Sequence, residues 1–233
     1  MQRKAIVIGA TGLVGQYLVK QLSEIYDTLI VIARRPLRYI NASIHFYQVN
    51  DFDNLAEICA NIGADQNTDA FSCLGTTRKL AGSDEAFRKV DHDYNVSFAK
   101  LCREKGVENF FLLSAMNNDI DSRFLYNRVK AETEQSIRAL GFKQLLIFRP
   151  SLLLGKHKGR TLENVSQNIF KVFSPLVPES LSIHPISARR VASAMTMSAN
   201  NVYERRKFQS ADLPSTTSII ENKEMLAMTR VKH

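Results

Sequence analysis

Short apolar runs alternate with amphipathic stretches along the first 150 residues of the chain. Apolar runs predict buried strands at Ala5–Ile8, Leu29–Ala33, Ile44–Val49, Ala70–Leu74, Phe110–Ser114 and Leu145–Phe148. Between them, apolar residues at helical spacing predict helices near Leu13–Ser23, Leu55–Asn61, Glu85–Lys105 and Tyr126–Leu140. Strands that are apolar throughout and alternate with helices are typical of a parallel sheet covered on both faces. The pattern therefore predicts a doubly wound α/β fold.

The pattern changes after Pro150, where prolines divide the rest of the chain into shorter pieces. Helices are expected at Leu162–Phe173, Arg189–Ala199 and Ser218–Met228. We therefore expect a nucleotide-binding core over residues 1–150 and a small C-terminal cap over residues 151–233. The cap is expected to pack on the core within one structural domain and to set substrate specificity.

Three glycines stand between the first predicted strand and the first predicted helix, which is the context of a dinucleotide-binding loop. Gly9 permits the tight turn, Gly12 lets the backbone approach a pyrophosphate, and Gly15 allows close packing of helix and strand. Backbone N–H groups near Leu13 and Val14 then face the phosphates at the positive end of the helix dipole. The alternative is a purely structural turn. Strand, spacing and N-terminal position together favour a cofactor site in a Rossmann-type fold.

The residues after the second predicted strand bear on the choice between NAD and NADP. Domains specific for NAD usually place an acid there, to bind the ribose 2′-hydroxyl. This chain has Arg34 and Arg35 instead, and no carboxylate between Asp27 and Asp51. Two guanidinium groups suit a 2′-phosphate, although one or both could merely end the strand. We therefore expect NADP(H) as the cofactor.

A tyrosine and a lysine follow the fifth predicted strand at helical spacing. Tyr126 and Lys130 share one helix face, and Ser114 ends the preceding strand, where ligands bind in open α/β sheets. The lysine ammonium would favour the phenolate, so that the phenol could exchange a proton with a substrate oxygen. Ser114 would orient the same oxygen. The spacing alone is common by chance, and the position after the fifth strand is what favours a catalytic role.

Together these motifs resemble the short-chain dehydrogenase/reductase superfamily in its atypical and extended branches. The chain is similar more narrowly to the Tat-interactive-protein-2-like oxidoreductases and their bacterial relatives. The stretches that carry this narrower resemblance are Cys73–Arg78, Val90–Tyr94, Phe124–Tyr126 and Glu221–Lys223.

The resemblance implies NADP(H) binding and a Ser–Tyr–Lys triad at Ser114, Tyr126 and Lys130. It also implies that Asp51 contacts the adenine, that Gly75 lines the cofactor groove and that Pro150 passes the nicotinamide end. The expected cofactor-binding residues are Gly9, Thr11, Gly12, Leu13, Val14, Gly15, Arg34, Arg35, Asp51, Cys73, Leu74, Gly75, Lys130 and Pro150. Many members of the superfamily carry an asparagine of a proton relay in the helix after the fourth strand. This chain has Asp91 there, with Asn95 one turn further on.

Composition limits the classes of function. Of the 233 residues, 45% are apolar and 23% are charged, and no apolar run is long enough for a transmembrane helix. The first residues lead straight into a strand, and the three cysteines are widely spaced, so we expect buried thiols in a cytoplasmic protein. The histidines lack metal-ligand spacing, and no metal is expected. The net charge of +8 suits anionic partners in general, but it is dispersed and comes without a nucleic-acid motif, so an ordinary basic surface is favoured over a nucleic-acid interface.

Two functions remain. The first is an NADP(H)-dependent oxidoreductase, a monomer or homodimer, acting on a small carbonyl or alcohol through the triad. The second is a non-catalytic NADP(H)-binding redox sensor or regulatory protein, since some atypical members of the superfamily act as regulators. The complete triad favours the enzyme, and the aspartate at position 91 favours the sensor.

Overall fold

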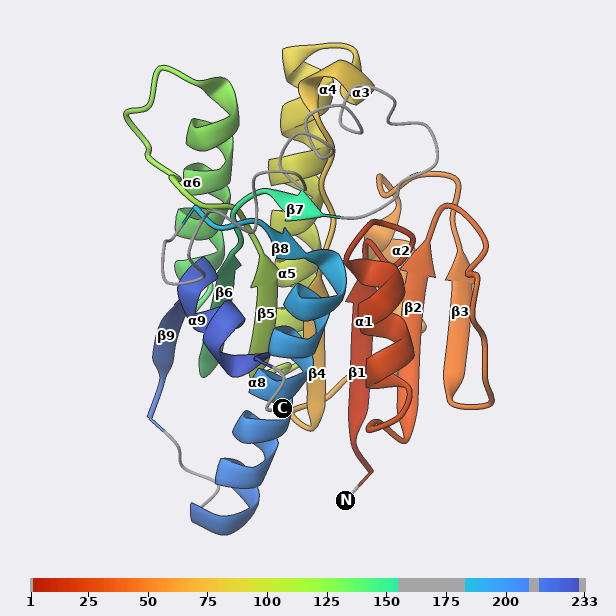
Figure 1. The fold of residues 1–233 in the computed structure, drawn as a ribbon. Helices are drawn as coiled ribbons and strands as arrows, with labels where there is room; N and C mark the ends of the chain where they lie inside the picture. Colours follow the sequence, from red (N-terminus) through yellow and green to blue (C-terminus); the bar gives the residue numbers. More distant parts are fainter. Residues whose placement is uncertain (1, 155–182, 210–213, 231–233) are drawn as a thin grey trace.

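A seven-stranded parallel sheet forms the centre of the molecule (Figure 1). The computed structural model describes residues 2–154, 183–209 and 214–230. The strand order is β3-β2-β1-β4-β5-β6-β9. The strands are β1 (Lys4–Ile8), β2 (Thr28–Ala33), β3 (Ile44–Gln48), β4 (Thr68–Ser72), β5 (Asn109–Leu113), β6 (Gln144–Arg149) and β9 (Thr216–Glu221). A separate pair of short strands joins β7 (Leu153–Leu154) to β8 (Ile186–Ser187). The predicted doubly wound Rossmann-type fold is confirmed.

Successive side chains of each strand point to opposite faces, so an apolar strand serves two cores at once. In β1, Ala5 and Val7 belong to one buried cluster, while Ile6 and Ile8 belong to the other. The central strands therefore need apolar residues at every position, which is why they appear in the sequence as unbroken apolar runs.

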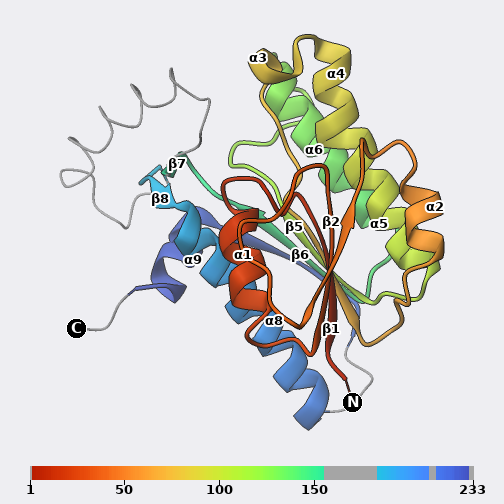
Figure 2. The same cartoon turned by 90° about the vertical axis from the view of Figure 1, so that its right-hand side faces the viewer.

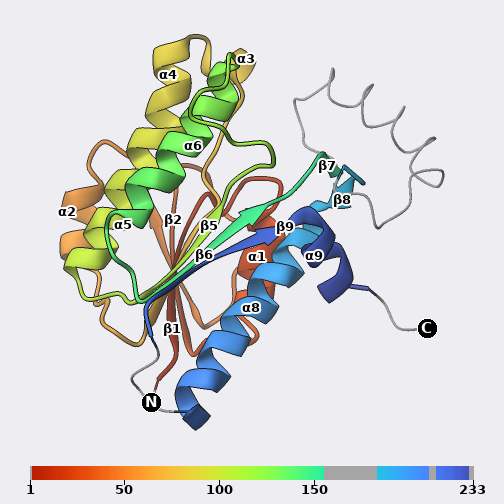
Figure 3. The ribbon, with the colours of Figure 1, turned by 90° about the vertical axis from the view of Figure 1, so that its left-hand side faces the viewer.

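Helices cover both faces of the sheet (Figures 2 and 3). One face carries α1 (Gly15–Leu22), α8 (Ala188–Gln209) and α9 (Asn222–Met228). The other carries α2 (Leu55–Ala60), α5 (Tyr94–Glu104) and α6 (Leu125–Arg138), while α3 (Arg78–Ala81) and α4 (Asp84–Arg88) lie beyond the carboxyl ends of the strands. Among the helices that the structure describes, none has both the length and the apolarity needed to cross a membrane.

The long helix predicted over Glu85–Lys105 contains a π-helical turn. The turn, η1, spans Lys89–Asp93 and lies between α4 and α5. It brings the side chain of Asp91 to a fully buried position facing α6. A π turn of this kind is frequent at functional sites.

Two elements after residue 150 differ from the prediction. The helix expected over Ser218–Met228 is wrong in its first part, because Ser218–Glu221 belongs to β9, which pairs with β6. The β-branched residues before Asn222 favour a strand, and the helix starts only where Glu221 and Glu224 form a capping box. The helix expected over Arg189–Ala199 is confirmed and continues to Gln209. The helix expected at Leu162–Phe173 lies outside the described residues.

The chain after residue 150 contributes to the sheet and to the core. The edge strand β9 extends the sheet beyond β6, and the buried residues of α8 join the same apolar cluster as those of α1. The three cysteines are buried and free, as expected.

Candidate cofactor and active site

The candidate site lies where the strand order reverses. From β1 the chain builds outward to β2 and β3, and then returns to place β4 on the other side of β1. Ligands of doubly wound sheets bind at this point, at the carboxyl ends of the strands. Both segments that meet there, the glycine loop after β1 and residues 73–75 after β4, were predicted to bind the cofactor.

The glycine loop packs directly against the segment that follows β4. Gly9 has a φ of +76°, and a Cβ built there would lie 2.3 Å from the carbonyl carbon of Cys73. A Cβ on Gly15 would lie 2.2 Å from the Gly9 carbonyl oxygen. Only glycine fits either position. Helix α1 begins at Gly15, after Val14, without a side-chain cap. A loop without side chains at these positions, followed by the start of α1, fits the close approach that a dinucleotide pyrophosphate makes to the backbone.

A pocket of about 310 Å³ lies beside this loop, between α1 and the residues after β2. Its lining includes three cationic side chains, Lys20, Arg35 and Arg38, and no acidic side chain among the described residues. The Arg35 guanidinium reaches the Thr11 hydroxyl at 3.5 Å. The Arg34 guanidinium instead lies 5.9 Å from the centre of the Phe52 ring. Of the two predicted arginines, the structure thus brings Arg35 to the glycine loop.

Asp51, Cys73 and Pro150 are not among the residues that line this pocket, and they have other surroundings. The Asp51 carboxylate is exposed and accepts a hydrogen bond from the Asp53 backbone N–H at 2.9 Å. Pro150 is buried, and its carbonyl accepts from the Met116 N–H at 3.0 Å. Burial raises the pKa of the Cys73 thiol to about 12, although the nearby Lys130 ammonium opposes the shift.

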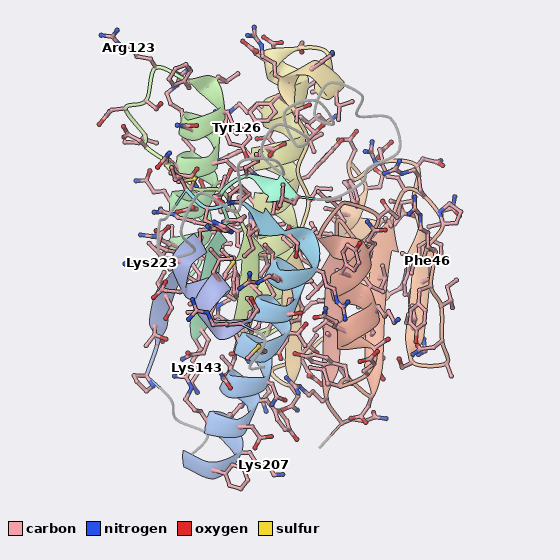
Figure 4. The ribbon with its side chains drawn as sticks, viewed as in Figure 1. Phe46, Arg123, Tyr126, Lys143, Lys207 and Lys223 are labelled. Atoms are coloured by element: carbon pink, nitrogen blue, oxygen red, sulfur yellow. The ribbon has the colours of Figure 1, made fainter. Side chains whose placement is uncertain are left out.

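Tyr126 and Lys130 are brought together at the start of α6. The Lys130 Nζ lies 6.0 Å from the centre of the Tyr126 ring. Tyr126 is 41% exposed and stacks on Phe87 of α4, with ring centres 5.8 Å apart. Figure 4 places Tyr126 at the end of the molecule toward which the sheet strands point, far from Lys143 and Lys207. This is the end at which the glycine loop lies.

Lys130 is only 6% exposed, and its ammonium forms an ion pair with the Asp91 carboxylate at 2.8 Å. Burial lowers the pKa of Lys130. The charges of Asp91, Tyr126 and Glu134 outweigh burial, so this pKa is raised overall and the lysine stays charged.

Ser114 has other partners than the tyrosine with which it was predicted to act. Its hydroxyl donates to the Glu134 carboxylate at 2.7 Å and accepts from the Asn118 side-chain amide at 2.8 Å. Glu134 lies eight residues after Tyr126 on α6, which is about 12 Å along a helix axis. The structure therefore groups Tyr126 with Lys130, and Ser114 with Glu134.

The sequence analysis did not identify the roles of two buried carboxylates of this site. It named Asp91 but not its ion pair with Lys130, and it did not name Glu134. Glu134 is 3% exposed and binds the Arg149 guanidinium through both of its oxygens, at 3.0 and 2.6 Å. Burial raises the pKa of Glu134, but hydrogen bonds from Arg149 and Ser114 outweigh it and leave this pKa below the ordinary value. Glu134 lies four residues after Lys130 on the same helix face, and this spacing was the feature of the sequence that could have indicated its place in the site.

Asn95, the residue one turn beyond Asp91, links η1 to β4. Its amide donates to the carbonyls of Leu74, Val90 and Asp91, and its oxygen accepts from the Ser72 hydroxyl. The segment before Gly75 is thereby fixed to the helix that carries Asp91.

A parallel sheet with a glycine loop at its switch point and a buried lysine beside it is characteristic of dinucleotide-binding Rossmann proteins. The chain belongs to the NAD dependent epimerase/dehydratase family, whose model matches residues 5–177. This family binds a nicotinamide dinucleotide, and its members and structural neighbours are oxidoreductases and epimerases. The resemblance to extended short-chain dehydrogenases is confirmed.

Curated relatives agree with this assignment. Protein FMP52-1, mitochondrial, of Scheffersomyces stipitis is 32% identical over 205 residues, which cover 86% of this chain and 90% of that protein. Protein HTATIP2 of Rattus norvegicus is 38% identical over 160 residues, which cover 66% of this chain and 64% of that protein. The FMP52 relatives are named as mitochondrial proteins, so the expectation of a cytoplasmic location is contradicted.

Solved structures share the fold. A short chain dehydrogenase family protein from Francisella tularensis superposes with a TM-score of 0.67 at 13% identity and covers 96% of this chain and 99% of its own. The UDP-Glc/GlcNAc 4-epimerase of Campylobacter jejuni gives a TM-score of 0.69 at 13% identity and covers 97% of this chain and 82% of its own.

Proposed function

We propose that this protein is an NADP(H)-dependent oxidoreductase that acts on a small carbonyl or alcohol, with Tyr126 as the acid–base group. The observation that carries the proposal is the buried, charged Lys130 beside Tyr126, at the end of the sheet where the glycine loop lies. When bound, NADP(H) supplies or accepts the hydride. The protein's own residues bind the cofactor, orient the substrate and move the proton.

The three cations that line the pocket beside Thr11 support NADP(H) over NAD(H). Of these, Arg35 reaches the glycine loop and would bind the 2′-phosphate, and Arg38 and Lys20 would add positive charge. An acid that would bind the ribose 2′-hydroxyl of NAD is absent from the described lining.

In the reductive direction, the Tyr126 hydroxyl would give its proton to the substrate oxygen as the hydride reaches the adjacent carbon. In the oxidative direction, the phenolate would take the proton back. The charged Lys130 would stabilise the phenolate in both directions, because an opposite charge within a few ångströms favours the ionised form. Ser114, at the end of β5, would bind the substrate oxygen with its hydroxyl hydrogen turned from the Glu134 carboxylate to that oxygen.

A second candidate is a redox sensor that binds NADP(H) without turning over a substrate. The observation that favours it is the hydrogen bond of Ser114, which donates its hydroxyl hydrogen to Glu134. Glu134 lies about two helical turns after Tyr126 on α6. A serine that has committed its one hydrogen cannot also donate it to a substrate carbonyl.

The Tyr126→Phe variant separates the two candidates. For an enzyme, turnover of a panel of aldehydes, ketones and quinones with NADPH should fall by about 10²–10⁴-fold, while NADPH affinity is unchanged. The Tyr94→Phe variant, which alters a tyrosine that instead contacts Asp53, serves as the control. Equal turnover by wild type and Tyr126→Phe would refute the catalytic role of Tyr126.

A further inference from the structure

A buried ion pair joins the π-helical turn to α6 beside the cofactor groove. The Asp91 carboxylate is 0% exposed, and one of its oxygens faces the Lys130 Nζ at 2.8 Å. The other oxygen accepts a hydrogen bond from the Thr76 backbone N–H at 2.7 Å. One carboxylate therefore contacts both the segment after β4 and the lysine of α6.

The ion pair lies directly behind Gly75. A Cβ added to Gly75 would lie 3.2 Å from the Asp91 Oδ1 and 3.5 Å from the Lys130 Nζ. No side chain separates the pair from this segment, so the Lys130 ammonium sits against the backbone that lines the expected groove.

The position of Asp91 is itself fixed by hydrogen bonds to its backbone. The Asp91 carbonyl accepts from the Asn95 amide at 3.0 Å and from the Thr133 hydroxyl on α6 at 3.0 Å. The π turn thus places this carboxylate, and α6 and α5 hold the turn. A flexible surface acid would not need such support.

We propose that Asp91 is a positioning residue for cofactor binding, which keeps the buried Lys130 charged and holds its ammonium against the Gly75–Thr76 wall of the groove. This inference rests on the proposed function, and on Lys130 being one of the residues expected to bind the cofactor. In place of the asparagine relay expected from the family, this chain uses a fixed ion pair. The bound dinucleotide would meet a preformed ammonium group.

The physical reason is the cost of burying a charge. A lysine without an anionic partner in the interior loses its proton readily, because burial disfavours the charged form. The charged or titratable described groups that face Lys130 are Asp91 from η1, Tyr126 and Glu134 from α6, and Cys73 from the end of β4. Glu134 is already bound to Arg149, and the Cys73 thiol stays neutral. Asp91 is therefore the anion in direct contact with the ammonium.

The test is NADPH affinity, followed by cofactor fluorescence, in the Asp91→Asn variant from about pH 7 to about pH 9.5, where a lysine deprived of its anion would lose its proton. Asparagine keeps an oxygen for the Thr76 N–H and replaces the charged oxygen that faces Lys130 with an uncharged NH2 group. We expect the wild type to bind NADPH almost equally across this range. The variant should bind about tenfold more weakly at the alkaline end than at the neutral end, because a charge-assisted contact is lost.

Two further variants make the result decisive. Asp91→Asn combined with Lys130→Arg should bind NADPH independently of pH, because a guanidinium stays protonated. Asp93→Asn, two residues away and paired with His92 at the surface, should behave as wild type. An Asp91→Asn variant whose affinity is as independent of pH as that of the wild type would overturn the inference and leave the proposed function standing. A wild type that binds no NADPH would overturn the proposed function itself.

Discussion

The ion pair between Glu134 and Arg149 predicts a large loss of stability in the Glu134→Ala variant. The carboxylate is almost fully buried and binds the guanidinium through both oxygens, and it also accepts from Ser114 and Asn118. Removing one partner of a buried pair costs about 3–5 kcal/mol, because the other charge is left without its counterion. Arg149 keeps a contact with Glu221 at 3.5 Å and is partly exposed, so we expect the lower end, about 3 kcal/mol.

For a chain of this size, a loss of about 3 kcal/mol corresponds to a fall in Tm of about 6–12 °C. Thermal and urea unfolding of the purified variant would measure it. The matched control is Glu132→Ala, which removes a carboxylate of the same helix from a more exposed pair with Arg88 and should cost less than about 1 kcal/mol. A Glu134→Ala variant that loses no more than this control would refute the assignment of Glu134 as a buried, paired charge.

The same ion pair makes the free energy of unfolding depend on pH. The pKa of Glu134 is lower in the folded protein than in the unfolded chain, so its contribution is complete above the unfolded value of about 4.3 and is lost as the pH falls through the folded value. The difference in unfolding free energy between wild type and Glu134→Gln should therefore be constant near neutral pH and shrink in acid. A difference that grows in acid would contradict the lowered pKa.

Two further predictions concern the groove. The Arg35→Ala variant should bind NADPH about ten- to a hundredfold more weakly with little change for NADH, since a charge-assisted contact contributes about 1.5–3 kcal/mol. Arg34→Ala is the control. Equal losses of affinity for both cofactors in Arg35→Ala would argue against a 2′-phosphate contact. Burial raises the pKa of Cys73 to about 12, so iodoacetamide at about pH 8 should label this thiol only after the protein is unfolded. Mass spectrometry would measure the labelling. Rapid labelling of the native protein would mean that the thiol is exposed or ionised.

The sequence predicted the central strands because they are buried on both faces and therefore continuously apolar. It did not predict β9, because an edge strand with an exposed first half, Thr216–Ser218, has no such run. The capping box of Glu221 and Glu224 marks the start of the helix that follows at Asn222, and the expected helix was placed four residues too early, over the end of this strand. The π turn was not predicted, because the single extra residue shifts the apolar spacing too little to be distinguished from a regular helix.

The sequence predicts those parts of the candidate site that depend on the spacing of residues within one strand–helix unit. It does not predict the parts that depend on tertiary contacts. The glycine loop and the Tyr126–Lys130 pair are visible within one strand–helix unit each. The partners of Lys130 and Ser114 are not, because Asp91 and Glu134 look like ordinary surface acids in the sequence. Which carboxylate is buried depends on how the π turn and α6 pack on the sheet.

The central claim is that the groove at the switch point binds NADP(H), and the most direct measurement is a fluorescence titration of the purified protein with NADPH and, separately, with NADH. We expect saturable binding of NADPH with at least about tenfold weaker binding of NADH, because only NADPH carries the 2′-phosphate that Arg35 would bind. Equal affinities would contradict the assignment of the cationic pocket to that phosphate, and the absence of binding by either cofactor would contradict the account of the site as a whole.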